Sequence, residues 1–205
     1  MKEKDVYAEL SSIRDLMERS SKFISLSGLS GILAGIYALI GAAVGYWLIS
    51  KFSAGEAGIS YSTEPFLFWQ LFIIALAVLS FSIFTACWFT MKNARAKNEN
   101  VWNPVSRRLL SSIAVPLITG GLFILIMLAK GNYSLIASAC LIFYGLALVS
   151  GSHYTFSDVR WLGIFEILLG LIALALPVYG LVIWAIGFGL LNILYGSIMH
   201  FKYDQ

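Results

Sequence analysis

The sequence is short of charged residues. Only 12% of its 205 residues are Asp, Glu, Lys or Arg, against about 25% in a typical soluble protein. Glu166 is the only charged residue in five long apolar stretches, which cover 23–50, 66–91, 109–129, 133–151 and 161–199. A water-soluble domain needs polar groups over its whole surface, so this distribution excludes a soluble globular protein and indicates an integral membrane protein.

Reactive motifs are also missing. The two cysteines, Cys87 and Cys140, lie inside apolar stretches and form no CxxC or zinc-finger spacing, which argues against a disulfide framework or a zinc site. The sequence has no HExxH, GxSxG or phosphate-loop motif. We therefore expect no cofactor, no metal and no enzymatic activity, with a lipid-handling enzyme that uses loop residues as the open alternative.

The apolar stretches predict membrane-spanning helices. They are continuous rather than alternating, which excludes a β-barrel, and about 20 apolar residues suffice to cross the hydrocarbon core. The last stretch is long enough for two spans, separated near Pro177 and Gly180. We predict an all-α bundle of six spans, built of three helical hairpins, at about 23–50, 66–91, 109–129, 133–151, 159–176 and 180–200.

A candidate internal repeat supports the hairpin description. Shifting 118–158 by 46 residues aligns it with 164–204 without a gap, and Tyr133 then meets Tyr179. A duplicated hairpin is one explanation, and chance similarity between leucine-rich helices is the other.

Residues 1–22 predict a cytoplasmic amphipathic helix before the first span. Its apolar stripe consists of Val6, Leu10, Ile13 and Met17, at the spacing of one helix face. We expect this helix to lie on the membrane surface or to pack on the bundle. Docking of a cytoplasmic protein partner is the alternative.

Basic residues predict the orientation. With the N-terminus inside, the inner segments hold twelve basic residues and the outer loops hold only Lys51 and Lys130. An excess of Lys and Arg marks cytoplasmic segments, so both termini are predicted to be cytoplasmic. The same clustering at span ends explains the net charge of +3 without nucleic acid as a partner.

Small residues line one face of the first span. They recur at helical spacing and are Ser27, Gly31, Gly35, Ala38, Ala42 and Gly45. Helices in lipid associate through close packing, which small residues permit. This face is expected either to pack inside the bundle or to form the seam of a homo-oligomer.

Glu166 is the first candidate for a functional site, because a carboxyl group inside a membrane is costly. Asn192 lies on the next span, at a similar distance from the turn at 177–179. We therefore predict a Glu166–Asn192 hydrogen bond. A structural clasp, a site for a proton or cation, and a contact with lipid headgroups are the three interpretations.

His153, His200 and Arg160 are candidates at the cytoplasmic edge. All three stand at predicted span ends, where long or amphipathic side chains reach the lipid headgroups. Two histidines there can also sense pH or bind a metal, but neighbouring ligands at a suitable spacing are missing from the sequence.

Two segments resemble known families of membrane proteins. The segment SSKFISLSGLSGILAGIYALIGA at 20–42 resembles the start of an uncharacterised family of bacterial six-span membrane proteins, which implies the bacterial inner membrane. The hairpins of 118–200, with LALP and GLLNILYGSIM, are similar to HdeD-like acid-stress membrane proteins. Neither resemblance transfers functional residues.

The sequence leaves three functions open. The first is a non-enzymatic stress-related or regulatory membrane protein that acts through oligomerisation or a protein partner. The second is a small-solute or ion transporter or channel that uses Glu166. The third is a lipid-handling enzyme.

The predicted orientation can be tested by cysteine labelling. In a variant with Cys87 and Cys140 replaced by alanine, Ser53→Cys is expected to react with an impermeant maleimide on intact cells. Asn98→Cys is expected to react only after the membrane is permeabilised, because it lies on the basic, cytoplasmic side. Labelling of Asn98→Cys on intact cells would reverse the orientation.

Overall fold

The computed structural model describes residues 28–53, 65–96, 102–156 and 158–203. The predicted amphipathic helix of 1–22 and Ser27 of the small-residue face lie outside the described residues. Every element in the described ranges is helical, as the composition predicts.

The described residues form long helices and several shorter helical segments. In order these are α2 (Gly28–Ser53), α3 (Pro65–Ala96), α4 (Pro104–Ala129), η1 (Tyr133–Leu135), α5 (Ile136–Gly151), η2 (Ser152–Tyr154), α6 (Asp158–Ala175), η3 (Pro177–Tyr179), α7 (Gly180–Trp184), η4 (Ala185–Leu191) and α8 (Asn192–Tyr203). The element η4 is a π-helix of 7 residues. The predicted sixth span is therefore not one uniform α-helix but α7, a π-helical segment and α8.

Five segments are long and apolar enough to cross a membrane by length and composition. They are Gly28–Lys51, Trp69–Asn93, Pro104–Ala129, Tyr133–Tyr154 and Pro177–Lys202. The helix α6 is not among them, because its 18 residues include Asp158, Arg160 and Glu166. The structure thus shows a helical bundle typical of a membrane protein.

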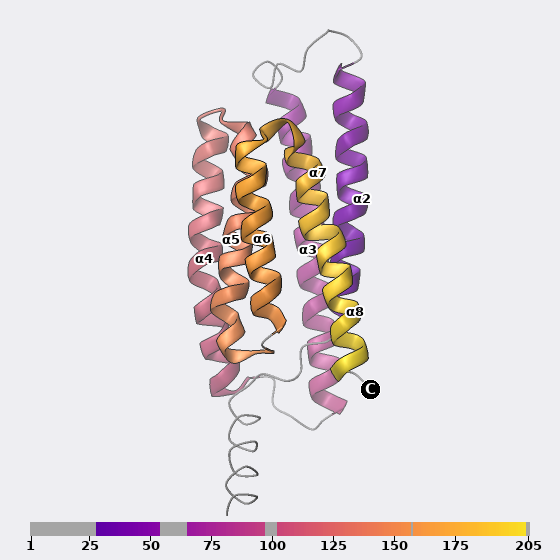
Figure 1. The fold of residues 1–205 in the computed structure, drawn as a ribbon, viewed down its shortest axis with the longest axis vertical. Coiled ribbons are helices and arrows are strands. Elements are labelled where there is room, and N and C mark those ends of the chain that lie inside the picture. Colours follow the sequence, from indigo (N-terminus) through magenta and orange to yellow (C-terminus); the bar gives the residue numbers. More distant parts are fainter. Residues whose placement is uncertain (1–27, 54–64, 97–101, 157, 204–205) are drawn as a thin grey trace, which may run out of the picture.

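The helices lie side by side along one axis (Figure 1). The helix α5 packs between α4 and α6, while α2 packs between α3 and the last segment formed by η4 and α8. Figure 1 shows the C-terminus at the same end as the α5–α6 link. The end of α3, the starts of α4 and α6 and the end of α8 lie at this same end of the bundle (Figure 1). These parts of the helices hold six of the eight described Lys and Arg residues, namely Lys92, Arg95, Arg107, Arg108, Arg160 and Lys202.

Asn103 and Pro104 define the start of α4. Asn103 caps the helix, since its side-chain oxygen accepts a hydrogen bond from the Ser106 amide at 2.7 Å. The Ser106 hydroxyl in turn accepts a hydrogen bond from the backbone N–H of Asn103 at 3.0 Å. Pro104 occupies the first turn, where its missing N–H costs nothing. The helix continues through Pro116 to Ala129.

Glycine contacts hold the helices together. A Cβ atom placed on Gly35 would lie 2.6 Å from the Gly189 carbonyl oxygen, so α2 and η4 touch backbone to backbone. A Cβ atom placed on Gly31 would likewise lie 3.3 Å from the Cα atom of Gly196 in α8. A second contact joins α5 and α6, where a Cβ on Gly145 would lie 2.6 Å from the Gly163 carbonyl oxygen.

The predicted small-residue face of α2 therefore packs inside the bundle. Ala38 and Ala42 on the same face are buried, and Gly45 lies against Leu71 and Leu181. A second copy of the chain would have to displace the last helical segment to use this face.

Gly35→Ala is expected to lower the stability of the protein. The added methyl group has no room against the Gly189 carbonyl, and overpacking of this kind costs about 1–3 kcal/mol. The measurement is the apparent Tm of the purified protein in detergent. Gly121→Ala is the matched control, because nothing lies within 4 Å of its Cβ position. An equal Tm for both variants would contradict the close α2–η4 contact.

Candidate functional site

Glu166 lies at the centre of α6 and is completely buried. It is 8 residues from the start of the helix at Asp158 and 9 from its end at Ala175, or roughly 12–14 Å from either end. Its side chain has 0% exposure, and neither carboxyl oxygen has a hydrogen-bond partner among the described residues. Burying a polar group without such a partner is costly, so this carboxyl group stands out from the rest of the bundle.

The carboxyl group of Glu166 packs against the π-helical segment. A Cβ on Gly187 would lie 2.5 Å from the Glu166 Oε2 atom and 2.5 Å from the Leu141 Cδ2 atom. A larger residue at this position would force the carboxyl group and the Leu141 side chain to shift. Single π-helical turns are found frequently at functional sites, and here the turn lies directly against the buried acid.

The predicted Glu166–Asn192 hydrogen bond is wrong. The Asn192 Oδ1 atom accepts a hydrogen bond from the Tyr144 hydroxyl at 3.1 Å. The side-chain nitrogen Nδ2 of Asn192 donates a hydrogen bond to the backbone carbonyl of Phe188 at 3.1 Å. The prediction counted residues along a uniform α-helix, whereas the π-helical segment before Asn192 changes the direction in which its side chain points. The interpretation of Glu166 and Asn192 as a structural clasp therefore lacks the hydrogen bond on which it depended.

Three aromatic rings pack together at the π-helical segment. The rings of Tyr144 and Phe188 have centroids 4.8 Å apart, and those of Trp184 and Phe188 are 5.0 Å apart. Phe188 directly follows Gly187, and Trp184 and Phe188 pack on the core that contains Leu141. The π-helical segment therefore contacts the carboxyl group at Gly187 and carries one of the three rings, Phe188.

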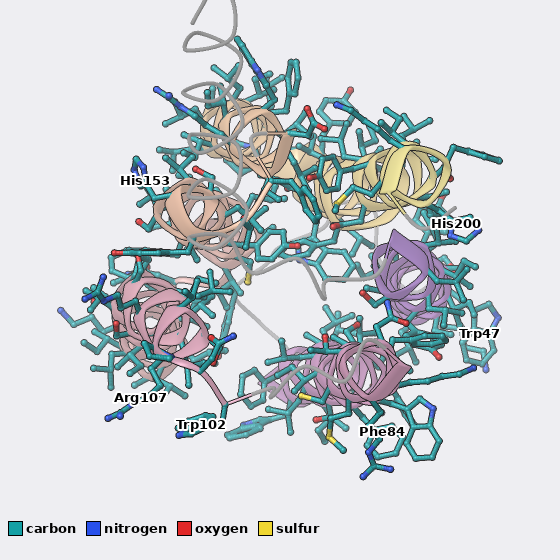
Figure 2. The ribbon with its side chains drawn as sticks, turned by 90° about the horizontal axis from the view of Figure 1, so that it is seen from below. Trp47, Phe84, Trp102, Arg107, His153 and His200 are labelled. Atoms are coloured by element: carbon teal, nitrogen blue, oxygen red, sulfur yellow. The ribbon has the colours of Figure 1, made fainter. Side chains whose placement is uncertain are left out.

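The cytoplasmic-edge candidates are not part of this cluster. His153 lies in η2 and His200 near the end of α8, and Figure 2 shows them on opposite sides of the bundle. Arg160 is exposed at the start of α6. No group of three His, Cys, Asp or Glu side chains that could hold a metal occurs in the described ranges.

The second described acid has a different environment. Asp158 at the start of α6 forms an ion pair with Lys202 of α8 at 2.9 Å, and both side chains are partly or largely exposed. A surface pair of this kind contributes little to stability. Glu166 is therefore the acid whose burial needs another explanation.

Sequence reasoning missed Tyr144 and Gly187. A signal for Tyr144 was present, because a tyrosine at the middle of a span stands away from the interfacial belts where tyrosine is common. Gly187 gave no such signal, since the chain has 18 glycines and only the tertiary contact shows what this one accommodates.

Comparisons with protein-family models, with curated proteins and with solved structures give no match. The resemblances stated from the sequence stay predictions. The function proposed below is therefore argued from the geometry around Glu166.

A double-mutant cycle tests the Tyr144–Asn192 bond. Tyr144→Phe leaves the Asn192 oxygen unsatisfied and is expected to cost about 1–3 kcal/mol of unfolding free energy. The same change should cost clearly less once Asn192→Leu has removed the acceptor, because the two residues are coupled. Purely additive effects in equilibrium unfolding would show that the bond is not formed.

Proposed function

We propose that this chain is a six-span protein of the bacterial inner membrane that moves a small solute or ion, with Glu166 as its cation-binding group. Five segments can cross a membrane, and α6 packs along α5 inside the same bundle. Two of the three charged residues of α6 stand in its first turn, at the level where charged side chains reach the headgroups. These observations support α6 as the sixth span.

The concentration of basic residues at one end supports cytoplasmic termini. The helix ends on the side of the C-terminus carry most of the described Lys and Arg residues. Lys51 and Lys130 stand in the last turn of α2 and directly after α4, and these two helices end on the opposite side of the bundle (Figure 1). This distribution follows the rule for cytoplasmic segments.

The observation that carries the proposal is the complete burial of Glu166 without a hydrogen-bond partner among the described residues. An ionised carboxyl group enclosed in this way would cost several kcal/mol. Either a bound proton or a bound cation offsets that cost. Ionisable groups inside membrane segments commonly mark ion paths and proton relays, and the neighbouring π-helical turn offers a segment able to rearrange.

The regulatory alternative has less in its favour. The small-residue face, which first suggested this alternative, is covered by the bundle itself, because Gly31 and Gly35 lie against α8 and η4. The amphipathic segment of 1–22, which also suggested it, lies outside the described residues.

Proton flux in proteoliposomes tests the proposal. Vesicles that contain the purified protein and a trapped pH indicator are given a membrane potential, and the rate of internal pH change is recorded. The wild-type protein is expected to raise the rate above that of empty vesicles. Glu166→Gln keeps the shape of the side chain but cannot release a proton, and we expect at least a tenfold loss of the added rate.

Asp158→Asn is the matched control for this experiment. It also replaces an acid of α6 by its amide, but at the exposed end of the helix, and it should retain the wild-type rate. Equal rates for wild-type and Glu166→Gln protein would refute a role for Glu166 in proton movement.

A further inference from the structure

The carboxyl group of Glu166 is covered by two other helical segments. A Cβ atom on Gly187 would lie 2.5 Å from the Glu166 Oε2 atom and equally close to the Cδ2 atom of Leu141. The π-helical segment η4 therefore lies on the acid at Gly187, and α5 supplies Leu141 at the same place. With 0% exposure, the carboxyl group can exchange a proton only after one of these covers moves.

The cover from α5 is fixed on α6. A Cβ on Gly145 would lie 2.6 Å from the Gly163 carbonyl oxygen, and a Cβ on Gly170 would lie 3.0 Å from the backbone nitrogen of Ile142. Gly163 and Gly170 stand on either side of Glu166 along α6. Close backbone contacts of this kind hold helices together in lipid, so the π-helical segment is the cover that can move.

Asn192 follows the π-helical segment and replaces one of its backbone hydrogen bonds. In a regular α-helix the backbone N–H of Asn192 would donate to the carbonyl of Phe188, four residues earlier. Here that N–H donates to the Gly189 carbonyl, and the side-chain nitrogen Nδ2 donates to the Phe188 carbonyl at 3.1 Å. A side chain that inserts between an N–H and its usual carbonyl distorts a helix. The Asn192 side chain therefore holds the segment in its irregular form.

The hydroxyl of Tyr144 holds the Asn192 side chain in place. It donates to the Asn192 Oδ1 atom at 3.1 Å, which leaves Nδ2 directed at the Phe188 carbonyl. Because Tyr144 belongs to α5, these bonds tie the π-helical segment to the helix that is fixed on α6. We call the two side-chain hydrogen bonds of Asn192, with Tyr144 and with the Phe188 carbonyl, the Asn192 latch.

Release of the Asn192 latch leaves the chain a second hydrogen-bond pattern. The N–H of Asn192 can then donate to the Phe188 carbonyl as in an α-helix. An α-turn holds fewer residues than a π-turn, so this change rotates Gly187 relative to Asn192. From Gly189 onward the chain lies against α2, where a Cβ on Gly196 would be 2.6 Å from a backbone carbonyl oxygen. The movement therefore falls on the residues before Gly189, which include Gly187.

We propose that the Asn192 latch holds the π-helical segment closed over Glu166, and that its release moves Gly187 away and opens the carboxyl group to proton exchange. This inference rests on the proposed function, to which it adds the moving segment and the contact that controls it. Only hydrogen bonds change partners in the opening step, and no covalent bond forms or breaks.

The rate at which Glu166 reacts with N,N′-dicyclohexylcarbodiimide tests the Asn192 latch. This apolar reagent enters lipid and adds to a protonated carboxyl group, and the adduct is stable. Purified protein in proteoliposomes is treated for increasing times, and mass spectrometry of its peptides gives the modified fraction at Glu166. The wild-type protein is expected to react slowly, because the carboxyl group is covered, and Glu166→Gln protein should carry no adduct at this position.

Variants of the latch should speed the reaction. Asn192→Leu removes both of its hydrogen bonds and is expected to raise the rate at Glu166 by about fivefold or more, since each bond is worth about 2- to 13-fold in an equilibrium. Tyr144→Phe keeps the bond to the Phe188 carbonyl but no longer orients it. We expect a smaller acceleration from this variant, of about twofold.

Two control variants separate the latch from general loosening of the bundle. Ser197→Ala removes the same kind of bond from α8, because the Ser197 hydroxyl donates to the carbonyl of Ile193 at 2.8 Å, but beyond the π-helical segment. Gly120→Ala crowds Phe143 between α4 and α5 and lowers stability away from that segment. Both variants should react at the wild-type rate, and the Tm of each protein identifies any that is unfolded.

A wild-type rate in folded Asn192→Leu protein would overturn this inference, and so would an equal acceleration in Gly120→Ala. The reaction with the carbodiimide does not require transport, so the two proposals fail separately. If the latch variants have no effect while proton flux still depends on Glu166, the proposed function stands without the latch. If they speed the reaction while flux is independent of Glu166, the latch stands as the cover of the acid and the proposed function fails.

Discussion

The close approach of helix backbones at glycine residues is the constraint on which the rest of the structure depends. Apolar side chains gain little from contact with each other when the alternative is lipid, so helices must come close enough for dense packing. Gly35 and Gly189 bring α2 against the π-helical segment, and Gly145 and Gly163 do the same for α5 and α6. The last helical segment thereby has one fixed position, between α2 on one side and α5 and α6 on the other.

That position creates the site. With the π-helical segment fixed, Gly187 faces Glu166, and the same turn places Phe188 over Tyr144. The wider turn also directs the Asn192 side chain toward the Phe188 carbonyl and the Tyr144 hydroxyl. The polar groups that could have satisfied the acid are thus used elsewhere. The isolation of Glu166 is a consequence of backbone geometry.

Much of the fold could be predicted because it follows from composition. The absence of charge over long stretches requires helices in lipid, and Asn103 followed by Pro104 is a local signal for the start of α4. The importance of Glu166 was also visible, since it is the one acid in the apolar stretches. Its surroundings could not be predicted, because counting along an ideal helix assumes a regular rise and turn, and Ala185–Leu191 departs from both.

The sequence by itself therefore determined the class of the protein, the positions of the helices and the residue at the centre of the site. These properties depend on local composition and on the free energy of placing each side chain in water or lipid. The tertiary structure decided which neighbour each helix face meets, that the small residues of α2 pack within the chain, that Gly187 lies against Glu166, and that Asn192 bonds to Tyr144. Such choices depend on contacts between residues far apart in the chain and on one irregular turn, which no local pattern records.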